Sequence, residues 1–138
     1  MSRRVDVVRR LFAAVEARDL GAVLDCYGDR IEIHEMPALP YGGVYRGRGG
    51  ARDHAEAFVR AWGPFQLGRE RLEPSFAETD DQRVVALFRH RALDEAGGAR
   101  LDVEEVGIYE VRDGVIERST MVHVDPERLV RFLGGSAR

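Results

Sequence analysis

The chain has 138 residues, and its 21 basic and 24 acidic residues leave a net charge of −3 with the histidines neutral. This length fits one compact domain, and a hydrophobic content of 44% is enough to form a core. All the basic residues are arginine, which excludes chemistry that needs a lysine, such as Schiff-base catalysis or a Walker A loop.

The amino-acid composition also bears on the binding partners and the cellular compartment. The single cysteine, Cys26, excludes an internal disulfide and fits a reducing compartment. The slightly acidic charge disfavours general binding to nucleic acid, and no apolar run approaches the ~18 residues that span a bilayer. We therefore expect one cytoplasmic domain over residues 1–138, with neither nucleic acid nor membrane as a partner.

The first half of the chain is mainly helical in pattern. Apolar residues recur at three- and four-residue spacing over residues 5–17, which predicts an amphipathic helix. Asp19 is a candidate N-cap of a second, shorter helix that carries Tyr27 and ends near Gly28. Alternation around residues 31–35 predicts a short strand that stops at Pro37. Residues 36–50, rich in glycine and proline, predict an ordered loop before a helix over residues 51–62.

The second half reads as strands and a closing helix. Strands are predicted near residues 65–78, 83–93, 101–111 and 115–124, with Asp113-Gly114 as the clearest hairpin turn. Asp125 followed by Pro126 and Glu127 predicts a helix start, and the helix runs to Gly134. The order ααβαββββα predicts an α+β fold.

Five segments together resemble a known fold: residues 17–20 with Tyr27, residues 34–37, 41–50, 109–117 and 125–134. They are similar to the nuclear transport factor 2-like superfamily, in particular its SnoaL-like polyketide cyclase and ketosteroid isomerase-like branch. The resemblance implies a curved antiparallel sheet wrapped around the three helices of the N-terminal half, a conical pocket and a short C-terminal helix. It also implies small enzymes without cofactors, although other members only bind ligands or proteins.

Strand alternation identifies side chains that face such a pocket, because successive residues point to opposite faces. Glu35 continues the apolar face of Ile31 and Ile33, and burial raises the pKa of a carboxylate toward a range useful for proton transfer. By the same spacing His90 is expected inside.

On the last two strands, Glu105 and Tyr109 are expected inside by their spacing. Register with the hairpin of the family favours Ser119, Met121 and His123 as the inward face of the last strand, which leaves Ile116, Thr120, Val122 and Val124 on the outward face. His34 is expected to point outward. Asp125 fits either a catalytic acid or base or a helix cap, with the cap favoured.

The candidate catalytic residues are Glu35, His123, His90, Tyr109, Tyr45, Glu105 and Asp125. Substrate contacts are expected from Phe58, Trp62, Phe88, Met121, Tyr41 and His54. No histidine pair has the spacing of a zinc site, and we expect neither a metal nor a cofactor.

Differences from two enzymes of this superfamily narrow the set of reactions that we expect. Leu11 and Gly107 stand where ketosteroid isomerase carries a tyrosine and an aspartate, so steroid isomerisation by that mechanism is not expected. His90 and Met121 replace the aspartates of limonene epoxide hydrolase, and Phe88 replaces its arginine.

We expect acid/base cyclisation or isomerisation of an apolar, carbonyl-containing molecule such as a polyketide intermediate. A non-catalytic binding or partner-recruiting module, and a hydrolase or dehydratase using the same pocket, remain alternatives.

The outer face of the predicted sheet indicates self-association. It would expose a set of aliphatic residues, namely Val85, Leu87, Val106, Ile108, Val122 and Val124, interleaved with charged residues. We therefore expect a homodimer through this convex face.

Overall fold

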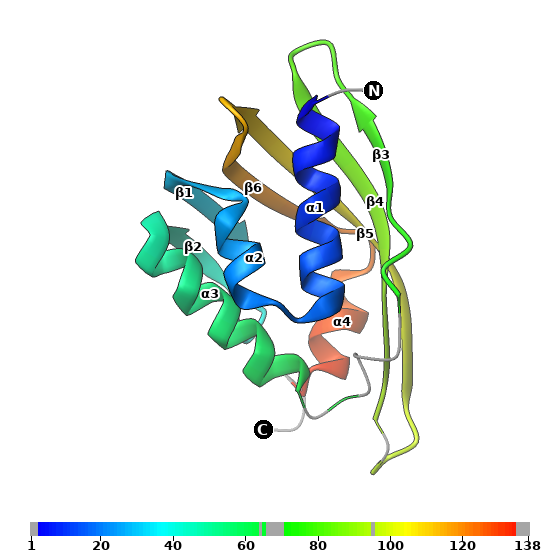
Figure 1. The fold of residues 1–138 in the computed structure, drawn as a ribbon. Coiled ribbons are helices and arrows are strands. Elements are labelled where there is room, and N and C mark those ends of the chain that lie inside the picture. Colours follow the sequence, from blue (N-terminus) through cyan, green and yellow to red (C-terminus); the bar gives the residue numbers. More distant parts are fainter. Residues whose placement is uncertain (1–2, 64, 66–70, 95, 135–138) are drawn as a thin grey trace.

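The computed structural model describes residues 3–63, 65, 71–94 and 96–134 (Figure 1). Its elements in chain order are α1 (Arg3–Ala17), α2 (Leu20–Asp25), β1 (Tyr27–Glu35), β2 (Gly43–Arg46), α3 (Gly47–Trp62), β3 (Ser75–Glu78), β4 (Arg83–Leu93), β5 (Arg100–Arg112), β6 (Val115–His123) and α4 (Pro126–Phe132). Within these described ranges, no helix has the length and apolar content needed to cross a bilayer.

The caps of α2 and α4 are the ones that the sequence predicts. The carboxylate of Asp19 accepts a hydrogen bond from the backbone N–H of Ala22, 3.1 Å away, and Asp125 does the same for Arg128 at 3.3 Å. Such caps satisfy donors that have no partner inside the helix. The placement of Tyr27 in the second helix is wrong, because α2 ends at Asp25 and Tyr27 opens β1.

The six strands form one sheet in the order β2-β1-β6-β5-β4-β3. The α+β fold class is confirmed, with one correction to the sheet, which is mixed. β1 runs parallel to its neighbour β6, whereas the other pairs are antiparallel. Parallel neighbours need a long crossover connection, and here all the elements from β2 to β5 lie between the two strands in the chain.

The segment expected to be a loop, residues 36–50, contains β2 and the start of α3. Tyr45 pairs with Ile33 of β1, so β2 becomes an edge strand. Gly43 and Gly47 flank its core with φ angles of +118° and +72°, which only glycine adopts without strain. Glycine therefore marks the ends of a strand here rather than a long loop.

The strand expected over residues 65–78 is shorter in the structure. β3 covers only Ser75–Glu78 and pairs with β4 at the sheet edge, while residues 66–70 of that prediction lie outside the described residues. The last helix, expected to run to Gly134, ends at Phe132 as α4. Gly134 has a φ of +92°, which lies outside the range of a right-handed helix.

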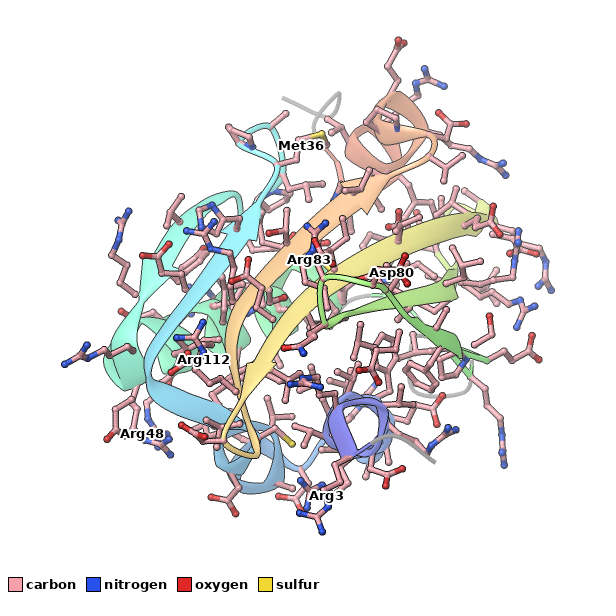
Figure 2. The ribbon with its side chains drawn as sticks, turned by 90° about the horizontal axis from the view of Figure 1, so that it is seen from above. Arg3, Met36, Arg48, Asp80, Arg83 and Arg112 are labelled. Carbon is pink, nitrogen blue, oxygen red and sulfur yellow. The ribbon has the colours of Figure 1, made fainter. Side chains whose placement is uncertain are left out.

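The helices α1, α2 and α3 cover one face of the sheet, and α4 lies at its lower end in Figure 1. Seen from above in Figure 2, the sheet curves around α1, whose axis starts at Arg3 and runs along the line of sight. One apolar cluster joins α1 to the strands around fully buried Val8 and Ile31, and a second cluster joins Trp62 to Leu129 of α4. These two clusters thus pack helices against the concave face on either side of the cavity described below.

A bulge in the β5–β6 pairing changes which residues of β6 face inward. The register shifts between Glu110 and Val111, so that Ile116 opposes Val111 while Ser119 opposes Tyr109. Ile116 and Ser119 are both buried, although their spacing of three would place them on opposite faces of a regular strand. The assignment of Ile116 to the outward set is therefore wrong.

The convex face carries the apolar residues that the sequence indicates. Leu87, Val122 and Val124 are exposed at 44%, 45% and 59%, whereas Val85, Val106 and Ile108 are already half-buried by their neighbours. Ion pairs border this apolar band, with Arg89 bonded to Asp102 on one side and Arg118 bonded to Glu32 on the other.

Candidate active site

A cavity of about 240 Å³ lies between the concave face of the sheet and the helices α1, α2 and α3. Its wall is mainly apolar and includes Phe12, Tyr27, Phe58, Trp62, Leu72, Phe88 and Met121. The polar side chains on the wall are few, among them Glu35, His54, His90, Ser119 and His123. An apolar cavity with a few convergent polar groups is the usual form of a small-molecule site.

Glu35 lies at the end of β1 and His54 on the face of α3 that packs against β1. The Nε2 atom of His54 lies 2.8 Å from Oε2 of Glu35, within hydrogen-bond distance. The Glu35 residue is only 8% exposed, so this contact holds the carboxylate in a nearly dry environment. Tyr45 packs edge-on against His54, with ring centroids 5.1 Å apart, and restricts the orientation of the imidazole ring.

A second carboxylate and imidazole pair lies on β5 and β6. Glu105 and His123 are opposite each other in the strand register, and Nδ1 of His123 is 2.8 Å from Oε1 of Glu105. Burial by itself lowers the pKa of His123, but the hydrogen bond to Glu105 and the negative charges of Glu105 and Glu35 outweigh it and raise the net pKa. His123 is therefore biased toward its protonated form.

The two pairs meet at one point on the cavity wall. Nε2 of His123 and Oε1 of Glu35 lie 4.0 Å apart, and neither atom has a hydrogen-bond partner among the described residues. Buried polar atoms are almost always hydrogen-bonded. A separation of 4.0 Å leaves room for an oxygen atom of a ligand to bond to both groups.

His90 of β4 provides a third unpartnered polar atom. Its Nδ1 atom is buried without a partner in the described part of the chain. Burial, aided by the positive charge of His123, lowers its pKa from 6.5 to about 3, so this imidazole stays neutral at physiological pH.

Two tyrosines on the wall retain their protons. Burial raises the pKa of Tyr41 and that of Tyr109 well above the usual value. The hydroxyl of Tyr41 accepts a hydrogen bond from the indole N–H of Trp62 at 3.1 Å, which leaves its own proton free to be donated. The ring of Tyr109 lies against Gly107, where an added Cβ would come within 2.6 Å of the phenolic oxygen.

Most of the predicted site residues line one cavity. The inward orientation expected for Glu35, His90, Tyr109, Met121 and His123 is confirmed, as is the presence of Phe58, Trp62, Phe88, Tyr41 and His54 on the wall. Their roles in a reaction stay predictions.

Three predicted residues are not on the wall. Glu105 lies behind His123 and is 1% exposed. Tyr45 donates its hydroxyl proton to the backbone oxygen of Tyr41, and Asp125 is an exposed helix cap. His34 points outward, as expected, and contacts Glu32 at 3.0 Å.

Three further residues that the sequence patterns did not indicate also line the cavity, namely Tyr27, Phe12 and Leu72. Tyr27 was assigned to a helix, and no regular spacing identifies it, because the alternation of Ile33 and Ile31 breaks at exposed Asp29 and the strand register shifts between Tyr27 and Glu32. Phe12 packs edge-on against Phe88, with centroids 4.9 Å apart, which no local pattern indicates.

Within the residues that the structure describes, no three histidine, cysteine, aspartate or glutamate side chains are arranged to hold a metal ion. The wall offers hydrogen-bonding and proton-transferring groups, and what the arrangement can do is move protons on a bound molecule.

Comparison with known proteins finds relatives over nearly the whole chain. Over 133 residues the chain is 29% identical to the uncharacterized protein Rv0034 of Mycobacterium tuberculosis, covering 93% of this chain and 94% of the relative. The structure of Bal32a, from a soil-derived mobile gene cassette, aligns with a TM-score of 0.80 at 21% identity, covering 95% of this chain and 96% of the other.

Two further structures share the fold. An NTF2-like protein of unknown function from Burkholderia pseudomallei has a TM-score of 0.76 at 23% identity, with 94% and 98% of the two chains covered. A protein of Xanthomonas campestris described as a candidate polyketide cyclase has a TM-score of 0.72 at 21% identity, with 92% and 94% covered. The family model of the SnoaL-like domain matches residues 8–119. The fold is therefore NTF2-like, and the chain belongs to the SnoaL-like domain family.

Proposed function

We propose that this protein is an acid/base enzyme that cyclises or isomerises an apolar small molecule carrying a carbonyl group. One observation carries the proposal: Glu35 Oε1 and His123 Nε2, both buried and without a hydrogen-bond partner among the described residues, lie 4.0 Å apart on the wall of an apolar cavity. A base and an acid at this distance can act on neighbouring atoms of one substrate.

Glu35 is the proposed base. Its Oε1 atom takes a proton from the carbon next to the carbonyl, while the contact of Oε2 with His54 fixes the orientation of the carboxylate. Removal of that proton turns the carbonyl into an enolate, whose negative charge gathers on the oxygen. In an apolar cavity this charge needs a positioned donor.

His123 is the proposed donor to that oxygen. Glu105 holds Nδ1, so the N–H at Nε2 is directed toward the substrate. In an isomerisation, the substrate also carries a carbon–carbon double bond conjugated with the enolate, and Glu35 returns its proton to the far carbon of that dienolate. In a cyclisation, the enolate carbon forms a bond to a second carbonyl carbon, the alkoxide formed there takes the proton of His123, and the proton on Glu35 restores His123.

Family membership supports this reaction class. The chain matches the SnoaL-like domain model, and a structural neighbour of the same fold is described as a candidate polyketide cyclase. An identity of 21% to that neighbour supports the fold alone, so the substrate is inferred from the cavity. Its volume of about 240 Å³ exceeds the ~150 Å³ cavity that binds one benzene, which favours a bicyclic or larger apolar body.

Deuterium exchange tests the first step without knowledge of the natural substrate. Bicyclic ketones such as 1-indanone and 1-tetralone are incubated with the protein in D₂O, and uptake of deuterium next to the carbonyl is followed by mass spectrometry. We expect the wild-type protein to speed up deuterium uptake relative to the same ketone in buffer alone. In the variants Glu35→Gln and His123→Ala, the rate of protein-catalysed uptake should fall by about 100-fold or more.

A matched control lies one residue before the proposed base. His34→Gln changes a side chain of the same strand that points away from the cavity, and its exchange rate should equal that of the wild type. Benzophenone, which has no hydrogen next to its carbonyl, controls for artefacts of labelling.

The outcomes separate the alternatives. Binding of these ketones without faster exchange would overturn the catalytic proposal in favour of a binding module, and absence of both would overturn the substrate class as well. Full exchange in both Glu35→Gln and His123→Ala would show that the assigned roles are wrong.

A further inference from the structure

His90 is enclosed by aromatic rings at the cavity wall. Its ring centroid lies 4.8 Å from that of Trp62, 5.4 Å from that of Phe88 and 6.1 Å from that of Phe58. The residue is 5% exposed and lines the cavity. Such an enclosure fixes the ring and favours a flat apolar occupant beside it.

The imidazole nevertheless has unused hydrogen-bonding capacity. A neutral imidazole carries one N–H donor and one acceptor nitrogen. Nδ1 of His90 is buried and has no hydrogen-bond partner among the described residues. In folded proteins, buried polar atoms are nearly always hydrogen-bonded. A hydrogen-bonding group of a ligand in the cavity would satisfy this nitrogen.

His90 occupies a different part of the cavity wall from the reacting groups. It lies on β4, whereas His123 lies on β6, and β5 separates the two strands. Two strand spacings amount to about 10 Å between the backbones, which is comparable to the width of a bicyclic ring system with its substituents. Phe88 lies level with Glu105 and His123 in the strand register, and His90 lies two residues further along the same face of β4. His90 and His123 therefore both face the same cavity.

We propose that His90 is a specificity-determining residue: it hydrogen-bonds a second hydroxyl or carbonyl group, on the part of the flat apolar ligand remote from the group between Glu35 and His123. This inference rests on the proposed function for the location of the first group. The ligand class is a bicyclic or larger aromatic molecule with two oxygen functions across its rings, and a molecule with one such function leaves Nδ1 of His90 unpaired.

Calorimetric titration with naphthols tests this assignment. The probes are 2-naphthol, with one hydroxyl, and the set of dihydroxynaphthalene isomers, with a second hydroxyl at different positions. In the wild-type protein at least one isomer should bind about tenfold more tightly than 2-naphthol, the effect of one buried hydrogen bond. In His90→Phe, which keeps an aromatic ring but removes both nitrogens, that gain should fall below about twofold.

Two further measurements keep the test decisive. His90→Leu repeats the comparison if the phenylalanine variant does not fold. Nitrogen NMR of ¹⁵N-histidine protein, in which the His90 signals are those missing from the variant, reports hydrogen bonding directly. These signals should move more with the preferred dihydroxynaphthalene than with 2-naphthol, which a purely structural role of His90 would not produce.

The proposal is overturned if no isomer gains over 2-naphthol, if none of the probes binds, or if the gain survives removal of His90. Its failure is distinguishable from failure of the proposed function. If the protein speeds up deuterium exchange of the ketones but a second hydroxyl brings no gain in affinity, only the role of His90 is removed. If a second hydroxyl raises the affinity, His90→Phe abolishes that gain and no ketone exchanges faster, His90 is a binding residue in a non-catalytic protein.

Discussion

The buried, neutral His90 makes a quantitative prediction about acid stability. Its pKa is lowered from 6.5 to about 3 by burial and by the charge of His123. Because the pKa in the folded protein lies below that in the unfolded chain, the unfolded chain takes up this proton first as the pH falls. Stability contributed by His90 is therefore complete above about pH 6.5 and is lost progressively toward pH 3.

The size of the effect follows from these two values. At pH 5.0 the imidazole is about 97% protonated in the unfolded chain and about 1% protonated in the folded protein. The resulting loss of unfolding free energy is about 2 kcal/mol relative to pH 7.5. Domains of this kind have a total stability of roughly 5 to 15 kcal/mol, so the loss is readily measurable.

The perturbation is His90→Phe, and the assay is urea unfolding between pH 7.5 and 5.0 for both proteins. The two carboxylate and imidazole pairs, Glu35 with His54 and Glu105 with His123, remain in both proteins, as do the other titratable groups of the cavity wall, so the difference between the two curves reports on His90. The difference should widen by about 2 kcal/mol toward pH 5.0 in favour of the variant. At pH 7.5 the variant should already be more stable by about 1 kcal/mol, because an unpaired buried nitrogen is removed.

A control removes a histidine that lies outside the cavity. His34→Gln should keep the steep fall toward pH 5.0, since His90 is still present. Parallel curves for the wild type and His90→Phe would refute the assignment of His90 as a neutral buried imidazole, and with it the electrostatic account of this part of the cavity.

Three further predictions concern the pair of Glu105 and His123, the packing of Tyr109 against Gly107, and the convex face of the sheet. Glu105→Gln removes the negative charge that raises the pKa of His123 and leaves only a neutral amide as its partner, so burial should then dominate and NMR titration should give a lower pKa for that ring; an unchanged value would contradict the pairing. Gly107→Ala places a methyl group 2.6 Å from the hydroxyl of Tyr109 and should cost about 1 to 3 kcal/mol in urea unfolding. Gly49→Ala, in α3 with no atom within 4 Å of its Cβ, should instead stabilise the protein by about 0.5 to 1 kcal/mol, and a loss in both variants would implicate the backbone rather than Tyr109. We propose that the convex face forms a homodimer: light scattering should give the mass of two chains, and Val122→Glu, at a residue 45% exposed in the single chain, should give the mass of one. A wild-type mass of one chain would exclude this interface.

The sequence alone determined those features that depend on local spacing. Alternation along a strand places Glu35 on the same face as Ile31 and Ile33, and the same rule orients His90 and Tyr109 inward. Helix caps are equally local, which is why Asp19 and Asp125 could be recognised from the residues that follow them.

Features that depend on which elements are neighbours could be decided only by the tertiary structure. Tyr27 joins a strand because β1 pairs with β6, and the bulge before Val111 turns both Ile116 and Ser119 inward. The short strand around Tyr45 exists because β1 provides a partner edge for it. In each case a hydrogen-bonding partner distant in sequence outweighs the local preference.

The pairing of the acid and base groups also belongs to the tertiary structure. Glu35 and His54 are 19 residues apart and meet only because α3 packs against β1, while Glu105 meets His123 through the register of β5 with β6. Sequence spacing indicates which face a side chain occupies, but the distance between two side chains depends on packing and strand register. The sequence therefore supplied the chemical groups, and the fold set the 4.0 Å between Glu35 and His123.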